Sequence, residues 1–230
     1  FMKKRHIFVL FLILIIAAGG AFIIFAHGDG ELIGQNELGS VERVDFTHSS
    51  NPQVKIGLVS GMHSREKLHQ FAIPIVCWVF ALNHDAEIIN YQVNVTKDPE
   101  DFYSGRANGE SLVHDYVVSD VEKSDLDLVI IGHDHEDGYG EGYYIATPTM
   151  DDPSVELARV VTNEIGFSHY TRNKSAPTQS SSILKVDNPI VDTGSRVFVY
   201  EIPENDRRLS SLSHTYQLLE SSYNHLIGNN

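Results

Sequence analysis

The chain has 230 residues, and 31 acidic side chains against 17 basic ones give it a net charge of −14 at pH 7. This length is enough for one sizeable hydrophobic core but not for two. A strongly negative surface repels phosphate backbones and anionic headgroups, which excludes nucleic acid as a partner of the folded part. Cys77 is the only cysteine, so no disulfide can form within the chain and a folded domain must depend on its core.

The first 26 residues have the pattern of a transmembrane anchor. Three basic residues at positions 3–5 precede an uncharged, apolar run over residues 7–26, about the length that crosses a bilayer as a helix. Basic residues stay on the cytoplasmic side, which predicts that the rest of the chain lies on the extracytoplasmic side of the membrane. A cleaved signal peptide is the alternative, although residues 24–26 form a poor cleavage site, and it would lead to a secreted domain.

Residues 27–52 are rich in glycine, serine, asparagine and acidic residues, which predicts a tether, with a short strand over residues 41–46 as an option. The folded domain is expected over residues 53–230, and its first core strand runs from Val54 to the glycine turn at Gly61. Hydrophobic periodicity predicts the remaining elements. They are, in chain order, a buried helix over residues 67–82 that contains Pro74, a strand over 87–95, a polar loop over 98–109, a short helix over 112–118, a core strand over 125–132, a helix over 154–165 capped by Asp151, a polar loop over 170–182, a core strand over 196–202 and an amphipathic helix over 209–226.

Strands that alternate with helices predict an α/β sheet, in which ligands bind beyond the carboxyl ends of the strands. His63 and Glu66 follow the first core strand directly, His133 follows the second, and Glu201 lies on the third. An imidazole and a carboxylate three residues apart can close on one cation, and zinc accepts this mixed set. The pattern His-x-x-Glu is weak alone, and an exposed turn with an incidental histidine is the plain alternative.

The order of these residues resembles that of the zinc carboxypeptidase family, including its succinylglutamate desuccinylase and aspartoacylase branch. The sequence Gly-Met-His-Ser-Arg-Glu at residues 61–66 is similar to the first zinc motif of that family. Residues 126–133 fit the strand that leads to its third ligand, and residues 197–204 fit the strand that bears its catalytic glutamate. The resemblance covers residues 54–204 and implies a short, divergent member with a mixed, mostly parallel central sheet flanked by helices.

The resemblance also implies a role for individual residues. His63, Glu66 and His133 would bind one Zn²⁺ per chain, with His135 as an alternative third ligand. Glu201 would be the general base that takes a proton from the zinc-activated water and passes it to the leaving nitrogen.

A cation is needed to stabilise an oxyanion or to hold a substrate carboxylate, and the resemblance assigns it to Arg106 with Asn108 beside it. The adjacent Asn-Arg pair of the family is absent here, which leaves recognition of a terminal carboxylate open. Tyr170 is the candidate for a phenolic group over the substrate, and Tyr139, Tyr143 and Tyr144 are alternatives. The expected substrate is a peptide or an acyl-amino acid.

Two rival interpretations remain. Residues 132–135 (Gly-His-Asp-His) are similar to one element of the calcineurin-type metallophosphoesterases, but the earlier Asp-x-His and the Gly-Asn-His motifs of those two-metal enzymes are absent from the sequence. The second rival is a non-catalytic, membrane-tethered binding domain with the same fold. A retained general base would have no purpose in such a protein.

Overall fold

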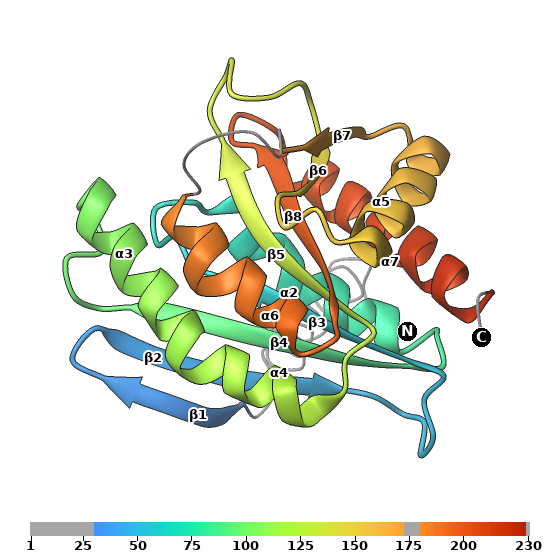
Figure 1. The fold of residues 1–230 in the computed structure, drawn as a ribbon, viewed down its shortest axis with the longest axis horizontal. Helices are drawn as coiled ribbons and strands as arrows, with labels where there is room; N and C mark the ends of the chain where they lie inside the picture. The colour runs from blue at the N-terminus through green and yellow to red at the C-terminus, as the bar shows by residue number, and fades with distance from the viewer. Residues whose placement is uncertain (1–29, 173–179, 229–230) are drawn as a thin grey trace, which may run out of the picture.

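An eight-stranded mixed sheet organises the computed structural model of the chain, which describes residues 30–172 and 180–228 (Figure 1). The strands are β1 (Glu31–Asn36), β2 (Gly39–Phe46), β3 (Val54–Ser60), β4 (Ala86–Val95), β5 (Leu128–His135), β6 (Tyr144–Thr147), β7 (Ser168–Thr171) and β8 (Arg196–Pro203). They are arranged in the order β1-β2-β4-β3-β5-β8-β6-β7. The four central strands, β4, β3, β5 and β8, are parallel, whereas β2 and β6 pair antiparallel at their two sides. The predicted α/β fold with a mixed central sheet is confirmed.

Helices cover both faces of the sheet (Figure 1). Those on one face are α2 (Leu68–Ala81), α5 (Asp152–Ile165) and α7 (Arg208–Ile227). Those on the other are α3 (Phe102–Leu112), the π-helical turn η1 (Val113–Val117), α4 (Val118–Ser124), the π-helical turn η2 (Ile183–Asp187) and α6 (Asn188–Asp192). Because both faces are covered, the central strands are buried on each side and consist of nearly continuous apolar runs.

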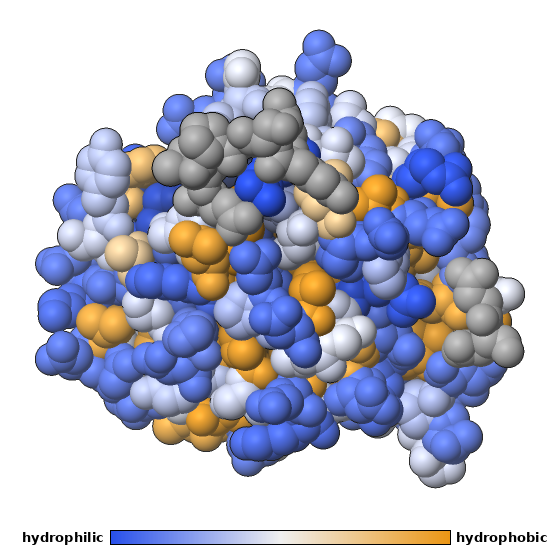
Figure 2. All heavy atoms as spheres, viewed as in Figure 1, coloured by the Kyte–Doolittle hydropathy of each residue, from blue (hydrophilic) through white to orange (hydrophobic). Residues whose placement is uncertain are grey.

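On the surface shown in Figure 2, hydrophilic side chains predominate and apolar ones form small, separate groups. This distribution agrees with the strongly acidic composition. Within residues 30–172 and 180–228, no helix has both the length and the apolar character needed to cross a membrane. The anchor predicted over residues 1–26 lies outside the described residues.

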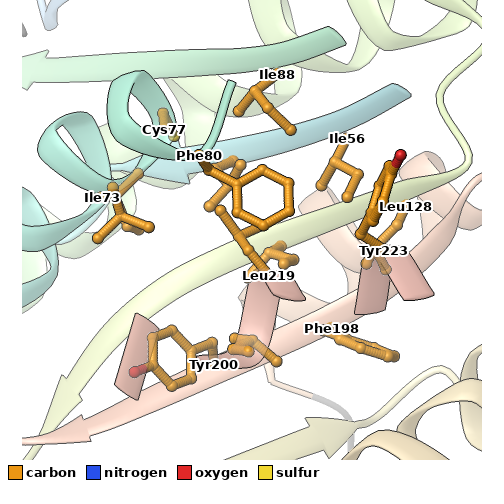
Figure 3. Packing of buried hydrophobic residues seen from close by; sticks show 14 of the residues in the cluster. Ile56, Ile73, Cys77, Phe80, Ile88, Leu128, Phe198, Tyr200, Leu219 and Tyr223 are labelled. Atoms are coloured by element: carbon orange, nitrogen blue, oxygen red, sulfur yellow. The ribbon is translucent and has the colours of Figure 1, made fainter. Parts of the chain in front are cut away.

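The core on the first face is built where α2 and α7 meet above the parallel strands (Figure 3). The ring of Phe80 is fully buried, and its centroid lies 5.5 Å from Tyr216 and 5.8 Å from Tyr223, both in edge-on contacts. His84 stacks on the same ring at 3.8 Å. The amphipathic helix predicted over residues 209–226 is confirmed as α7, and its apolar stripe is the surface that packs on α2 and the sheet.

The tether predicted over residues 27–52 is wrong for the part that forms β1 and β2. Val44 and Phe46 are buried in the core on one face of the sheet, and Val41 is buried in the core on the other face. Strand β2 pairs with β4 over its whole length, with Val41 opposite Val93. The short strand given as an option over residues 41–46 is confirmed as part of β2, whereas β1 was not predicted from the polar, glycine-rich composition around it.

The polar loop predicted over residues 98–109 is also wrong, because most of it forms α3. Asp101 caps this helix, and its side chain accepts hydrogen bonds from the backbone N–H groups of Tyr103 and Ser104. Gly109 does not mark a turn. A Cβ at this position would overlap the backbone carbonyl oxygen of Met62, so the glycine lets α3 approach the chain just before His63.

Replacing Gly109 with alanine should therefore separate α3 from the His63 segment. We expect Gly109→Ala to lower the free energy of unfolding by about 2 kcal/mol, which is typical of overpacking against a backbone that cannot retreat. Gly105→Ala, one turn earlier in the same helix, should cost less because the nearest atoms lie 3.1 Å from the added Cβ. Urea unfolding followed by circular dichroism measures both, and an equal cost would contradict the close approach at Gly109.

Candidate active site

The carboxyl ends of β3, β5 and β8 meet at one edge of the sheet. Strand β3 ends at Ser60, and Gly61 then turns the chain with a φ of +82°, in the region that favours glycine. His63 and Glu66 follow in the loop that leads into α2. His133 and Glu201 are direct register partners on the neighbouring strands β5 and β8, so their side chains point to the same face of the sheet.

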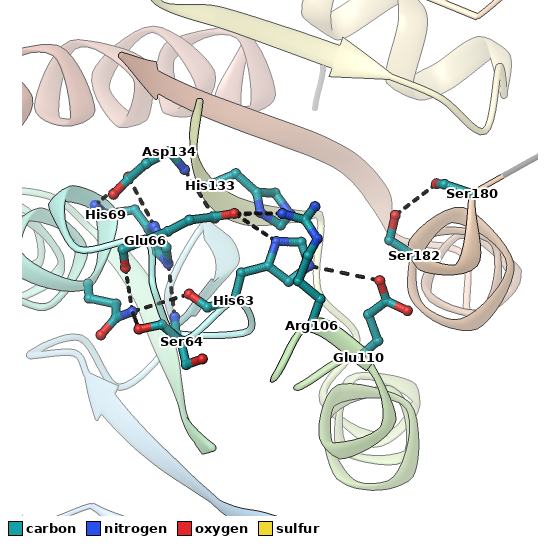
Figure 4. Close-up of polar contacts among 12 residues, drawn as sticks. His63, Ser64, Glu66, His69, Arg106, Glu110, His133, Asp134, Ser180 and Ser182 are labelled. Atoms are coloured by element: carbon teal, nitrogen blue, oxygen red, sulfur yellow. Dashed lines mark hydrogen bonds and ion pairs between the residues drawn. The ribbon is translucent and has the colours of Figure 1, made fainter. Parts of the chain in front are cut away.

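Three of these side chains converge on one point (Figure 4). Nδ1 of His63 lies 2.9 Å from Oε1 of Glu66, and Nδ1 of His133 lies 2.9 Å from Oε2 of the same carboxylate. The two imidazole rings are 4.3 Å apart between centroids. One potential ligand atom from each residue lies within 4.8 Å of the other two. The sequence-predicted trio is therefore brought together.

This set of donors fits a divalent metal ion. Two imidazole nitrogens and one carboxylate are the ligands of a common catalytic zinc site. Burial alone would raise the pKa of Glu66, but the charges and hydrogen bonds of His133 and His63 outweigh burial and hold that pKa well below its usual range. The carboxylate is therefore ionised and ready to coordinate a cation at any physiological pH.

His135 lies outside this cluster, although it shares a face of β5 with His133. Its Nε2 lies 2.9 Å from the carbonyl oxygen of Gly142, and its Nδ1 lies 3.1 Å from that of Glu136. Both ring nitrogens thus face backbone carbonyls of the loop that follows β5. Of the two alternatives for a third ligand, the structure brings His133 to His63 and Glu66.

Glu201 faces the cluster from the adjacent strand. Burial raises its pKa to about 7, while the nearby His133 acts in the opposite direction. A carboxyl group with a pKa near neutrality can both accept a proton and return it. Glu201 also lines a cavity of about 740 Å³ that opens from the cluster to solvent, together with His63, Ser64, Arg65, Glu66, Lys67, Leu68, Asp101, Phe102, Arg106, Asp134, His135, Glu136, Tyr139, Glu204 and Arg208.

Arg106 reaches this cavity from α3. Its Nη1 lies 3.1 Å from Oε1 of Glu66, and its guanidinium group lies over the Phe102 ring at 5.2 Å. Asn108 does not reach the cavity, because two residues along a helix place it on another side of α3. Its amide donates instead to the carbonyl oxygen of Lys97 at 2.8 Å. The expectation that Asn108 lies beside Arg106 at the site is thus corrected.

Tyr170 is likewise not among the residues that line the cavity. Its hydroxyl accepts a hydrogen bond from the backbone N–H of Glu141 at 3.3 Å, and its ring packs edge-on against Tyr144. Among the alternative tyrosines, Tyr139 lines the cavity and is largely exposed there. The phenolic group at the cavity is therefore that of Tyr139, in the loop after β5, and not that of Tyr170, in β7.

The role of Asp134 was not recognised from the sequence. Its hydrogen bonds hold the loop over residues 61–67, which carries His63 and Glu66, against β5. Its carboxylate accepts hydrogen bonds from the backbone N–H groups of Leu68 and His69, at 2.6 and 2.9 Å, and so caps α2. Its own backbone N–H donates to Oε2 of Glu66. Nε2 of His69 accepts from Gly61, which leaves the ring proton on Nδ1, 3.1 Å from Asp134.

Glu110 is the second residue that the sequence did not reveal. It is buried on α3, and its Oε1 lies 3.9 Å from Nε2 of His63 (Figure 4). That nitrogen is buried and has no hydrogen-bond partner among the described residues. A carboxylate behind a metal-binding histidine commonly fixes the tautomer and orientation of the ring. His63 thus faces Glu66 with Nδ1 and Glu110 with Nε2, so its ring lies between two carboxylates.

Solved structures of metallocarboxypeptidases share this fold. A metallo-carboxypeptidase from Burkholderia cenocepacia has a TM-score of 0.59 at 11% identity, and the alignment covers 100% of this chain and 70% of that chain. A metallo-carboxypeptidase from Pseudomonas aeruginosa, in complex with (2-guanidinoethylmercapto)succinic acid, has a TM-score of 0.59 at 12% identity, with 91% and 68% covered. Tripeptide-bound cell shape determinant Csd4 from Helicobacter pylori has a TM-score of 0.52 at 12% identity, with 81% and 55% covered.

No family model matches the sequence, and no curated protein matches it either. The likeness to metallocarboxypeptidases thus lies in the fold, which confirms the resemblance seen in residues 54–204 at that level. The structure adds that the residues which carried the resemblance converge at one edge of the sheet.

Replacing Asp134 with asparagine should weaken the hydrogen bonds that hold the loop over residues 61–67 against β5. An asparagine offers one acceptor in place of two and turns an N–H donor toward other N–H groups, so Asp134→Asn should cost about 1–3 kcal/mol of folding free energy and weaken metal binding. Asp151→Asn is the control, because the Asp151 side chain also caps a helix, through one hydrogen bond from the backbone N–H of Ser154 in α5, but does not line the cavity. Thermal unfolding and competition with a zinc chelator measure both properties. Equal loss of metal affinity in the two variants would contradict a positioning role for Asp134.

Proposed function

We propose that this chain, which has the fold of the metallocarboxypeptidases, is a zinc-dependent hydrolase of amide bonds with a carboxypeptidase-like or deacylase-like activity. His63, Glu66 and His133 would hold one zinc ion per chain. The observation that carries the proposal is the convergence of these three residues on one point, with Glu201 facing it from the adjacent strand inside a solvent-accessible cavity.

The chain's own residues supply the other parts of such a reaction. The zinc ion, when bound, would polarise the scissile carbonyl and acidify a water molecule. Glu201 would accept the proton of the attacking water on its carboxylate and deliver it to the leaving nitrogen. Arg106 would place a fixed positive charge where an oxyanion or a substrate carboxylate lies. Asp134 and Glu110 would hold the ligands in place from behind.

The substrate class follows from the same cavity. A guanidinium group beside the cluster suits a substrate that carries a carboxylate, as a peptide or an acyl-amino acid does. The succinic acid derivative and the tripeptide in the two neighbouring structures are ligands of that chemistry. They support, by analogy of fold, a peptide as the substrate here.

The metallophosphoesterase interpretation is less well supported. A two-metal site needs a second group of ligands, and His63, Glu66 and His133 are the one such group within residues 30–172 and 180–228. Asp134 caps α2, and His135 faces two backbone carbonyls, so neither residue of the Gly-His-Asp-His element is free to ligate a second ion. A non-catalytic binding domain remains the outcome that an absence of turnover would indicate.

We further propose that residues 1–26 anchor the domain to a membrane and place it on the extracytoplasmic side. The support is the sequence pattern of three basic residues followed by an apolar run of spanning length. Protease digestion of intact and of permeabilised cells tests this topology, because a cytoplasmic domain would be protected in intact cells.

The decisive experiment combines metal content with turnover. The zinc-loaded full chain should bind one zinc ion and release the C-terminal residue of N-blocked dipeptides. Glu201→Gln should keep the zinc but lower kcat by about 100-fold or more, because the proton acceptor is lost while the ligands remain. His133→Ala should lose the zinc together with the activity.

Glu204→Gln is the matched control for this experiment. Glu204 lines the same cavity three residues beyond Glu201, but it is exposed and lies past the end of β8. We expect this variant to retain most of its activity. Full activity of Glu201→Gln, or a protein that binds no zinc, would refute the proposed function.

The pH dependence of turnover should report the ionisation of Glu201. A general base must be deprotonated, so kcat/KM should fall as the pH falls through its pKa. Burial raises that pKa from 4.5 to about 7, whereas a bound cation lowers it, so the acid limb should lie between these two values. The pH profiles of kcat/KM for the wild type and for Glu201→Asp measure this acid limb. If the limb lies at the same pH in both proteins, it reports the ionisation of another group.

A further inference from the structure

Basic side chains line the cavity beside a larger number of acidic ones. Four of the 17 lysine and arginine residues line it, namely Arg65, Lys67, Arg106 and Arg208. Two of these are already engaged by the protein near the cluster. Arg106 pairs with Glu66, and the ammonium group of Lys67 donates to the backbone carbonyl of Ser64. Arg208, the first residue of α7, has a different environment.

The guanidinium group of Arg208 is held in place without an acidic partner. Arg208 is exposed, and its guanidinium group lies over the ring of Phe71 on α2, 4.9 Å from the ring centroid, in a cation–π contact that favours this position. No carboxylate of the described residues lies within 4.0 Å of it. A planar guanidinium with free donors at a cavity wall is suited to bidentate binding of a carboxylate.

The topology places Arg208 and Arg106 on different sides of the cluster. Helix α3, which carries Arg106, packs on one face of the sheet, and α7, which carries Arg208, packs on the other (Figure 1). Both side chains reach the cavity that lies at the carboxyl edge between these faces. A substrate that crosses this edge at Glu201 would meet one guanidinium group on each side.

We propose that Arg208, supported by Phe71, forms a subsite for a second carboxylate of the substrate, that of an acidic side chain. The inference rests on the proposed function and narrows its substrate class to peptides with a glutamate- or aspartate-like residue next to the scissile bond. Glu136 and Glu204 line the same cavity and would instead favour a basic side chain if they governed selection. Selection between acidic and basic substrates therefore tests the assignment.

The test uses two pairs of substrates in which glutamate and its neutral isostere glutamine are compared. N-benzoyl-Gly-Glu and N-benzoyl-Gly-Gln vary the residue after the scissile bond, and N-acetyl-Glu-Phe and N-acetyl-Gln-Phe vary the residue before it. The zinc-loaded full chain should prefer the glutamate member of one pair by about tenfold or more in kcat/KM, as expected for a charge-assisted hydrogen bond. Arg208→Gln should remove this preference by slowing only the glutamate substrate.

Arg207→Gln is the control, because it removes the same charge from the neighbouring residue, which does not line the cavity. It should leave the preference unchanged. Equal rates for both members of each pair, faster cleavage of a lysine analogue, or an equal loss for glutamate and glutamine substrates in Arg208→Gln would overturn the subsite.

A binding measurement separates failure of the subsite from failure of the proposed function. If the zinc-loaded chain cleaves no peptide of either pair, the proposed hydrolase activity fails. Calorimetric titration with N-acetyl-glutamate and N-acetyl-glutamine then tests the subsite alone. Tighter binding of N-acetyl-glutamate that Arg208→Gln abolishes would support the subsite, and equal affinities would overturn it.

Discussion

The site depends on how Asp134 joins a loop to a strand. His63 and Glu66 lie on a connection between β3 and α2, and a connection of this kind has no rigid geometry of its own. The carboxylate of Asp134 caps α2, and its backbone N–H binds Glu66, so one residue of β5 holds the end of the segment that leads into α2. The other end is held through His69, whose ring lies between Asp134 and the backbone N–H of Gly61. Because His133 directly precedes Asp134 on β5, the contacts of Asp134 also position the His133 side chain relative to Glu66.

The alternation of side-chain direction along β5 lets two neighbouring residues serve two different parts of the site. His133 points to the face of α3 and meets the cluster, whereas Asp134 points to the opposite face and meets the start of α2. His63, His133 and Arg106 then surround the carboxylate of Glu66, which is largely shielded from solvent. A buried charge is tolerated only when it is paired in this way, and a metal ion would serve the same purpose.

Local patterns were sufficient to predict the parts of the site that follow apolar strands. His63, Glu66, His133 and Glu201 each stand at or beyond the end of a run that only a core strand explains, so their convergence could be predicted from the sequence alone. Helix α3 could not be predicted in this way, because its two glycines are typical of a loop. Only the structure shows that Gly109 is needed for the close contact of the helix with Met62. Asp134 and Glu110 were missed for the same reason, since their roles depend on partners 66 and 47 positions away in the chain.

The fold narrows the chemistry, but the substrate must be selected by side chains outside the ligand trio. At 11–12% identity the neighbouring structures share the sheet and its helices, and such a likeness does not carry a substrate from one protein to another. An exposed guanidinium group without an acidic partner keeps its donors available to a ligand anion. Arg208 on its aromatic support is such a group, placed across the cavity from α3. Under the proposed function, the charges of the cavity wall, more than the proposed metal ligands, would decide which amide bonds reach Glu201.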